Sequence, residues 1–389
     1  MFSTRTAWVR TPNPLSKLLE RRRRDGSPVI DLTLSNPTEA GLNYPAAAIG
    51  RALGEAGRAA YAPEPFGLAV AREAVATHYR TMGRGFDAGR ILLTSGTSEA
   101  YTHLFRLLCD PGDTVLVPVP SYPLFEYLAR LSGVRVKPFA FSWDGSWHLD
   151  AGTLEAAVEP GTKAIILVHP NNPTGAYLKT EEWNIVCAVA RRAGLAAIVD
   201  EVFFDYPFGA DGRRAGTTAG EGGCLTFTLG GISKQCGMPH LKLAWIVVGG
   251  REDESREAIG RLEVIADTYL SVGTPVQAAL PSLLKIGEGI RDHITDRMRG
   301  NLAYVQQRLE VRSGCSLLPV EGGWYGVLRL PGVLTDEEWA LRLLGEAGVY
   351  VHPGYFFGFP HDGYLVISLL PSPAEFRAGI DAILHAAEA

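Results

Sequence analysis

Residues 164–200 read AIILVHPNNPTGAYLKTEEWNIVCAVARRAGLAAIVD, and this stretch predicts the fold. It holds an apolar run at Ala164–Val168, a turn rich in proline and asparagine, a helical pattern at Glu181–Arg192, and a second apolar run at Leu195–Val199. Apolar runs of about five residues joined by a helix are typical of a βαβ unit, whose parallel strands are buried on both faces.

The same pattern continues outward from this unit. A long helical pattern runs from Pro275 to Arg308, and beyond it strand-like segments at 323–330 and 364–369 flank a helical pattern at 336–347. We therefore expect an α/β protein with a large domain, in which helices flank a mainly parallel central sheet, and a smaller α+β domain. The expected parts are an N-terminal arm (1–44) that packs on the small domain or on a partner, the large domain (45–285) and the small domain (286–389). Further apolar runs of strand length are Ile91–Leu93, Thr114–Val119, Leu225–Leu229 and Ala244–Val248.

Composition excludes several classes of function. The chain has 389 residues and a formal charge of −5, so no net basic field exists to hold nucleic acid. No apolar run approaches the ~20 residues of a membrane span, and the first residues lack the features of a signal peptide. The five cysteines are scattered without a C-x-x-C, and the histidines show no metal-binding spacing. We expect reduced thiols, a cytoplasmic location and no metal site.

Polar residues follow four of the expected strands, at the edge where open α/β sheets bind ligands. Each has an ordinary structural explanation. The small residues at 94–98 resemble a helix cap as well as a phosphate site, and Asn172 lies in a turn that prolines make rigid. Asp200 is either a cap or the partner of a buried cation, and Lys234 is either a surface lysine or a desolvated nucleophile.

Taken together, these residues indicate a more specific chemistry. A phosphorylated pyridine aldehyde needs an amine to bind it covalently, a carboxylate to keep its ring nitrogen protonated, and a nest of N–H groups for its phosphate. Lys234, Asp200 and the segment 94–98 supply these groups at one edge of one sheet. Asn172 adds an amide that can bond a ligand oxygen.

These motifs resemble those of a known family, the fold-type I pyridoxal-phosphate enzymes, and specifically the class I/II aminotransferases. The resemblance covers almost the whole chain, from Ser35-Asn36-Pro37 to Pro353-Gly354 and Ser368. No single motif is specific, but their combination is. The motifs that carry it are Tyr61…Gly67, Ser95-Gly96-Thr97, Pro120-Ser121-Tyr122-Pro123, Asn172-Pro173-Thr174-Gly175, Asp200-Glu201-Val202 and Ser233-Lys234.

The resemblance implies a role for each matching residue. Lys234 corresponds to the lysine that forms the Schiff base with pyridoxal 5'-phosphate, and Asp200 to the partner of the ring nitrogen, so these two are the expected catalytic residues. Tyr61 corresponds to a tyrosine that reaches the phosphate of the partner subunit's cofactor, which implies a homodimer with shared sites. The other cofactor-binding residues implied are Ser95, Gly96, Thr97, Tyr122, Asn172, Val202, Ser233 and Lys242.

Four positions depart from the family pattern. Lys242 stands where an arginine commonly contacts the phosphate, Gly231 where a serine is frequent, and Phe203 where a tyrosine bonds the phenolic oxygen. Val366 stands where an arginine normally forks onto the substrate carboxylate. Either another group binds that carboxylate, with Asn36, Asn172, Arg329 and His352 as candidates, or the substrate presents none there.

The first hypothesis for function is therefore an aminotransferase that moves an amino group between an amino donor and a 2-oxo acid by ping-pong Schiff-base chemistry. An alternative is a lyase or another carbanion reaction on the same fold, since both share their first steps. A third, a sensor domain fused to a DNA-binding regulator, has no room in the ~40 residues before the fold. The substrate is not readable from the sequence.

Overall fold

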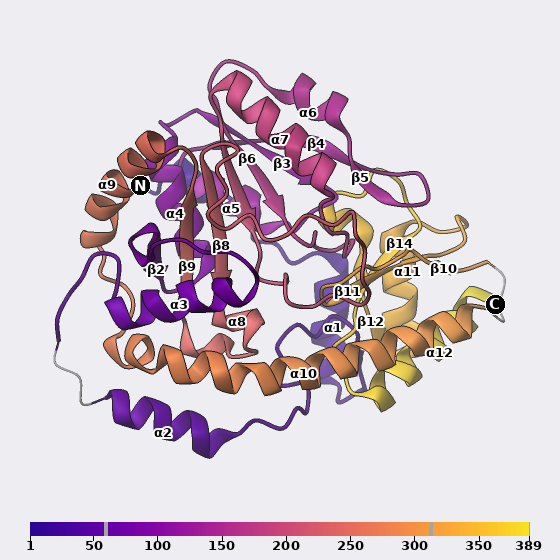
Figure 1. Cartoon of the computed structure of the whole chain (residues 1–389). Helices are drawn as coiled ribbons and strands as arrows, with labels where there is room; N and C mark the ends of the chain where they lie inside the picture. The colour runs from indigo at the N-terminus through magenta and orange to yellow at the C-terminus, as the bar shows by residue number, and fades with distance from the viewer. Residues whose placement is uncertain (58–60, 311–313, 389) are drawn as a thin grey trace.

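The computed structural model describes residues 1–57, 61–310 and 314–388 and is built around an eight-stranded sheet (Figure 1). Its strand order is β2-β9-β8-β7-β6-β3-β4-β5. The strands are β2 (Ile91–Thr94), β3 (Thr114–Val119), β4 (Arg135–Trp143), β5 (Trp147–Leu149), β6 (Thr162–Val168), β7 (Ala196–Asp200), β8 (Thr226–Gly231) and β9 (Ala244–Gly249).

The middle of this sheet is parallel, and its register brings the ends of three strands together. Asp200, the last residue of β7, lies opposite Val168 of β6 and Leu229 of β8. The segments that leave β6 and β8 therefore begin on either side of Asp200. β9 runs antiparallel to both β2 and β8, and β5 antiparallel to β4. The expectation of a mainly parallel sheet is confirmed.

Helices cover both faces of the sheet, as Figure 1 shows. One face packs on α4 (Thr97–Leu108), α5 (Leu124–Leu131) and α9 (Glu252–Asp267). The other face packs on α6 (Ala151–Ala157) and α7 (Thr180–Ala193) at one end and on α3 (Ala69–Thr81) at the other. The helix α10 packs on α3, and α2 (Ala46–Ala56) packs on α10. Neighbouring residues of β6 point to opposite clusters, Ile165 to the α7 side and Ile166 to the α4 side, so the strand is apolar throughout.

A smaller sheet forms the second part of the structure. Its order is β10-β11-β14-β13, and β1 pairs separately with β12. The N-terminal helix α1 packs against α11 of this part. The elements are α1 (Pro14–Arg24), β1 (Ile30–Asp31), β10 (Ser316–Leu317), β11 (Tyr325–Arg329), α11 (Asp336–Arg342), the π-helix η4 (Leu343–Ala347), β12 (Val349–Tyr350), β13 (His352–Pro353), β14 (Tyr364–Ser368) and α12 (Pro373–Glu388).

The long helix α10 (Thr274–Glu310) joins the two parts. It packs on α2 and α3 near its start and on α12 near its end (Figure 1). The expected boundary at residue 285 falls inside this helix, so that boundary stays a prediction. In the ranges that the structure describes, no helix combines the length and apolar character needed to cross a membrane.

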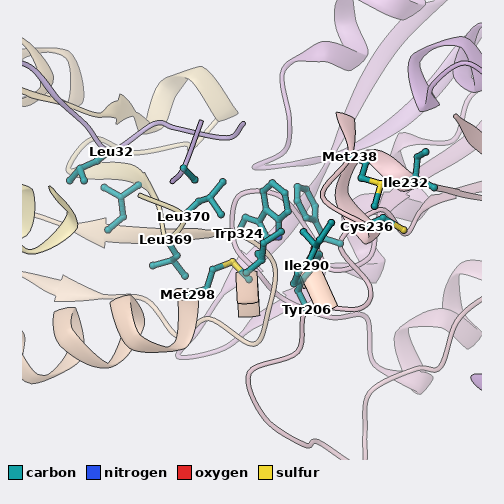
Figure 2. Packing of buried hydrophobic residues seen from close by; sticks show 14 of the residues in the cluster. Leu32, Tyr206, Ile232, Cys236, Met238, Ile290, Met298, Trp324, Leu369 and Leu370 are labelled. Atoms are coloured by element: carbon teal, nitrogen blue, oxygen red, sulfur yellow. The ribbon is translucent and has the colours of Figure 1, made fainter. Parts of the chain in front are cut away.

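Buried side chains also join the two parts, as Figure 2 shows. The short helix α8 (Ile232–Gln235) carries Lys234. Its first residue, Ile232, and the residue after its end, Cys236, are both buried. Tyr206 and Trp324 pack edge to face at 5.4 Å between their ring centroids, in the same cluster. The backbone beneath Lys234 is therefore held by a continuous core.

Candidate active site

A cavity of about 200 Å³ lies beyond the carboxyl ends of β6, β7 and β8. Side chains from the small sheet and from the N-terminal segment close it, because Tyr325 and Ser35 line it as well. Most of the site residues predicted from the sequence meet here. Those that line the cavity are Thr97, Tyr122, Asn172, Asp200, Val202, Ser233 and Lys234.

Lys234 projects into this cavity from α8, directly after β8. Its Nζ donates a hydrogen bond to the backbone oxygen of Ser35 at 3.2 Å and lies 4.8 Å from the centroid of the Trp324 ring. Burial lowers the pKa of Lys234 to about 8, because desolvation disfavours the ammonium form. At pH 7 roughly one amine in ten is therefore unprotonated and nucleophilic.

Asp200 ends β7 at the bottom of the cavity and is buried. Its carboxylate accepts hydrogen bonds from the Tyr101 hydroxyl at 3.3 Å and from the backbone N–H of Val202 at 3.2 Å. Burial nevertheless raises the pKa of Asp200 to about 6, and no basic side chain of the described residues offsets it. A cationic ring nitrogen in the cavity would supply the missing counter-charge.

The start of α4 has the geometry of a phosphate site. A Cβ atom placed on Gly96, which precedes the helix, would lie 3.4 Å from Nζ of Lys242, so the lysine amine sits directly over the glycine backbone. Free N–H groups at a helix start and one nearby cation suit a phosphate. Ser95 differs, because its backbone N–H already donates to Glu99 at 2.7 Å.

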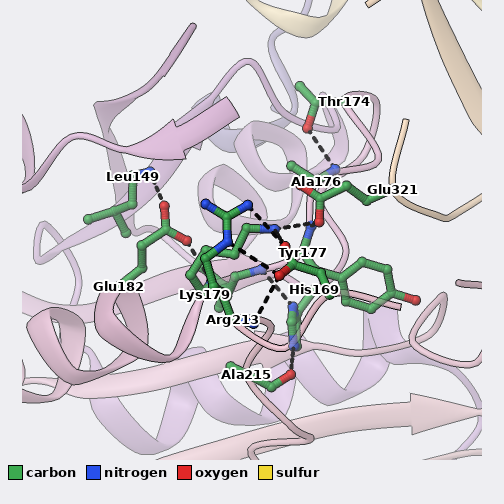
Figure 3. Close-up of polar contacts among 12 residues, drawn as sticks. Leu149, His169, Thr174, Ala176, Tyr177, Lys179, Glu182, Arg213, Ala215 and Glu321 are labelled. Carbon is green, nitrogen blue, oxygen red and sulfur yellow. Dashed lines mark hydrogen bonds and ion pairs between the residues drawn. The ribbon is translucent and has the colours of Figure 1, made fainter. Parts of the chain in front are cut away.

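The loop after β6, which carries Asn172, is held by a network of polar contacts among its other residues (Figure 3). His169 accepts the N–H of Leu178 at Nδ1 (3.0 Å), and its Nε2 lies 3.3 Å from the backbone oxygen of Ala215. Burial lowers the pKa of His169 to about 3, so the ring is neutral. Farther along, Lys179 binds Glu321 of the small part at 2.5 Å.

The Asn172 amide itself is buried, and its Oδ1 has no hydrogen-bond partner in the described structure. A buried amide left unpaired is costly, so its place on the cavity wall indicates that a ligand completes its hydrogen bonds. Together with the raised pKa of Asp200 and the amine of Lys242 over Gly96, this fits a ring that carries a cationic nitrogen, a hydroxyl that can donate to Asn172, and a phosphate.

Tyr61 is not brought to this cavity. It is 74% exposed and lines a shallow groove with Pro65, His103 and Leu270. Within one chain it therefore has no access to Lys234, and its expected role toward a partner's cofactor stays a prediction.

Two departures from the family pattern have a packing explanation. A Cβ on Gly231 would lie 2.9 Å from Cβ of Ala244, so the chain has no space for a serine there. Phe203 is buried and packs edge to face on Trp324, with 5.3 Å between ring centroids. Tyr325 adds a hydroxyl to the cavity that sequence reasoning missed, and burial raises its pKa to about 12.

Apart from Lys234, none of the described residues that line the cavity offers a cation to bind the substrate carboxylate. Val366 is fully buried in an apolar cluster with Val327, so an arginine there would test folding as much as donor preference. Asn36 uses its amide locally, with Thr38 and Glu39. Among the described residues that line the cavity, Lys234 is the one basic side chain.

Comparison with known proteins shows which family the chain resembles. A family model described as "Aminotransferase class I and II" matches residues 27–383. The glutamate-pyruvate aminotransferase AlaA of Haemophilus influenzae is 27% identical over 368 residues, which are 92% of this chain and 90% of that protein. The tyrosine aminotransferase of Mus musculus is 26% identical, covering 92% and 82%. The structure of an alanine aminotransferase from Pyrococcus furiosus superposes with a TM-score of 0.88 at 22% identity over 100% of both chains.

Proposed function

Because the chain belongs to the class I and II aminotransferases, enzymes that depend on pyridoxal phosphate, we propose that it moves an amino group from a donor to a 2-oxo acid in two half-reactions. The donor carbon loses its amino group and two electrons and becomes a carbonyl. The acceptor carbonyl gains the amino group and the two electrons in the second half-reaction. The electrons lost by the donor equal those gained by the acceptor, so the reaction needs no other oxidant.

The residues that would hold the cofactor follow from the site. Lys234 would bind it covalently, Asp200 would pair with the ring nitrogen, and Asn172 would bond the phenolic oxygen. Tyr122 and Val202 would cover the two faces of the ring. Thr97 and Ser233 line the same cavity. Gly96, Ser95 and Lys242 would surround the phosphate. When bound, the cofactor supplies an electron sink for the carbanion at the donor carbon.

The chain's own residues supply the proton transfers. The Lys234 amine would take the proton from the donor carbon, since its lowered pKa leaves part of it unprotonated at neutral pH. Asp200 would stay ionised beside a cationic ring nitrogen and would keep that nitrogen protonated. The convergence of Lys234, Asp200 and Asn172 on one cavity is the observation that carries this proposal.

The working unit in this proposal is a homodimer in the cytoplasm. The 74% exposure of Tyr61 leaves its ring free to contact a second copy, where the family resemblance puts the partner's phosphate. All five cysteines are free thiols, as in a reducing compartment.

A single turnover tests the reaction type. Protein loaded with pyridoxal phosphate and mixed with an amino acid, without an acceptor, should convert its cofactor to pyridoxamine phosphate and release one equivalent of the 2-oxo acid. Chromatography of the extracted cofactor and an ammonia assay measure both products. Release of ammonia with the cofactor returned as pyridoxal phosphate would indicate the lyase instead.

The lowered pKa of Lys234 predicts how cofactor capture depends on pH. Only the unprotonated amine attacks an aldehyde, so the rate at which the apoprotein takes up pyridoxal phosphate should rise with pH and level off above about 8. Stopped-flow absorbance over a series of pH values measures that rate. A midpoint near the usual lysine value of 10.5 would contradict the desolvated environment assigned to this amine.

A further inference from the structure

The cavity at Lys234 is too small for the cofactor and a whole substrate. Its volume is about 200 Å³, whereas pockets that hold ligands of this size measure roughly 300–1,000 Å³. A cofactor ring and phosphate would occupy most of it. Whatever the donor carries beyond its reacting carbon must therefore lie outside this cavity.

A second, larger groove shares two walls with the cavity. It measures about 850 Å³, and Tyr122 and Phe125 line both spaces. We call it the aromatic groove. It lies between α5, strands β3 and β4, and the 3₁₀ turn η5 (Gly354–Phe357), and its aromatic lining residues are Tyr122, Phe125, Tyr127, Tyr355, Phe356 and Phe357.

Charged groups of both signs lie at the rim of the groove. Arg130 is already engaged, since it donates to the backbone oxygens of Thr4 and Ala7 at 3.1 and 3.0 Å. Arg135 bonds the backbone oxygen of Gly112 and lies 3.6 Å from Glu159. Glu126 is exposed at the rim, and none of the described residues forms an ion pair with it. The charge at the rim is therefore mixed, and the aromatic lining is what selects the occupant.

The groove also offers a polar contact and a partial cover. The hydroxyl of Ser121, which is only 6% exposed, has no hydrogen-bond partner in the described structure and lies in the groove wall. At the other end, Trp8 of the N-terminal segment packs on Tyr127, with 5.5 Å between their ring centroids. A bound side chain would thus meet apolar surface on several sides and one free hydroxyl.

We propose that the aromatic groove receives the side chain of the amino donor and that the preferred donor carries a large, uncharged, apolar or aromatic side chain. This inference rests on the proposed aminotransferase function. The side chains of Tyr122 and Phe125, which line both spaces, place the groove beside the cavity, and its aromatic lining selects the chemistry of the occupant.

Single-turnover titrations of the loaded, full-length protein test the proposal. The probes are L-phenylalanine, L-alanine and L-glutamate, and the readout is the concentration of each that gives half-maximal rate of cofactor conversion. L-Phenylalanine should need the lowest concentration and L-glutamate the highest. Tyr355→Ala and Tyr127→Ala remove exposed rings, so both variants should fold. Each should raise the half-saturating concentration of L-phenylalanine about tenfold, because each loses roughly 50 Å² of apolar contact with that side chain.

In the same variants the half-saturating concentration of L-alanine should change by less than about twofold, because its methyl group does not reach the groove. Tyr304→Ala, which removes a partly exposed ring on α10, should leave the half-saturating concentrations of both donors unchanged.

Two results would overturn the inference. If Tyr355→Ala and Tyr127→Ala affect phenylalanine and alanine equally, or affect neither, the donor side chain does not lie in the groove even though the aminotransferase function stands. If none of the three amino acids converts the cofactor in the unchanged protein, the proposed function fails, and the inference fails with it.

Discussion

Replacing Lys234 by alanine should lower the rate of transamination by at least about 10³-fold, because the variant loses both the covalent attachment of the cofactor and the amine that moves the proton. The cavity offers no second basic side chain among its described lining residues. Initial rates with the best donor, measured for both proteins at saturating pyridoxal phosphate, give the ratio.

The attachment itself can be read independently of activity. Borohydride treatment of the unchanged protein should leave the cofactor on one peptide, the one that contains Lys234, as mass spectrometry would show. Lys285→Ala, which removes an exposed lysine on α10, is the matched control and should behave like the unchanged protein. Cofactor fixed on a different lysine in Lys234→Ala would refute the assignment.

Asp200→Asn should lower activity by about 10²- to 10³-fold, because an uncharged amide no longer holds the ring nitrogen protonated. Cofactor affinity should fall as well. Asp200→Glu keeps the charge and should retain more activity than the amide variant, although its longer side chain shifts the carboxylate. Equal activity of Asp200→Asn and the unchanged protein would mean that residue 200 does not contact the ring.

The same substitution should stabilise the cofactor-free protein at neutral pH. The carboxyl pKa rises from 3.8 to about 6 on folding, so the folded state binds the proton more tightly than the unfolded state. This group's contribution to stability is therefore fully present below pH 3.8 and is lost as the pH rises through about 6. The loss is of the order of 3 kcal/mol, from about two pKa units at 1.36 kcal/mol each.

Denaturant unfolding of the apoproteins at pH 5 and pH 8 checks this linkage. Asp200→Asn should gain stability over the unchanged protein, and the gain should be larger at the higher pH, where the buried carboxylate is charged. Cofactor should narrow the difference, because its cationic nitrogen favours the charged carboxylate. A gain that does not vary with pH would show that ionisation of Asp200 is not its source.

Local sequence patterns predicted the central strands well. The runs at Thr114–Val119 and Ala244–Val248 match β3 and β9 within a residue. Their direction was not predictable, and β9 proved antiparallel to both its neighbours. The two outer strands β4 and β5 were missed, since the polar residues and the proline in Arg135–Trp143 hide the strand pattern.

The sequence by itself determined the chemistry of the site, because the amine, carboxylate and amide each follow a strand whose apolar run is visible locally. Parallel strands end at one edge, so Lys234, Asp200 and Asn172 converge without further information. Only the tertiary structure decided what surrounds them: the hydroxyl of Tyr325, the closeness of Lys242 to Gly96, and the aromatic groove that α5 shares with η5. The physical reason is that these contacts join segments up to hundreds of residues apart, and side-chain packing between such segments leaves no periodic signal in the chain.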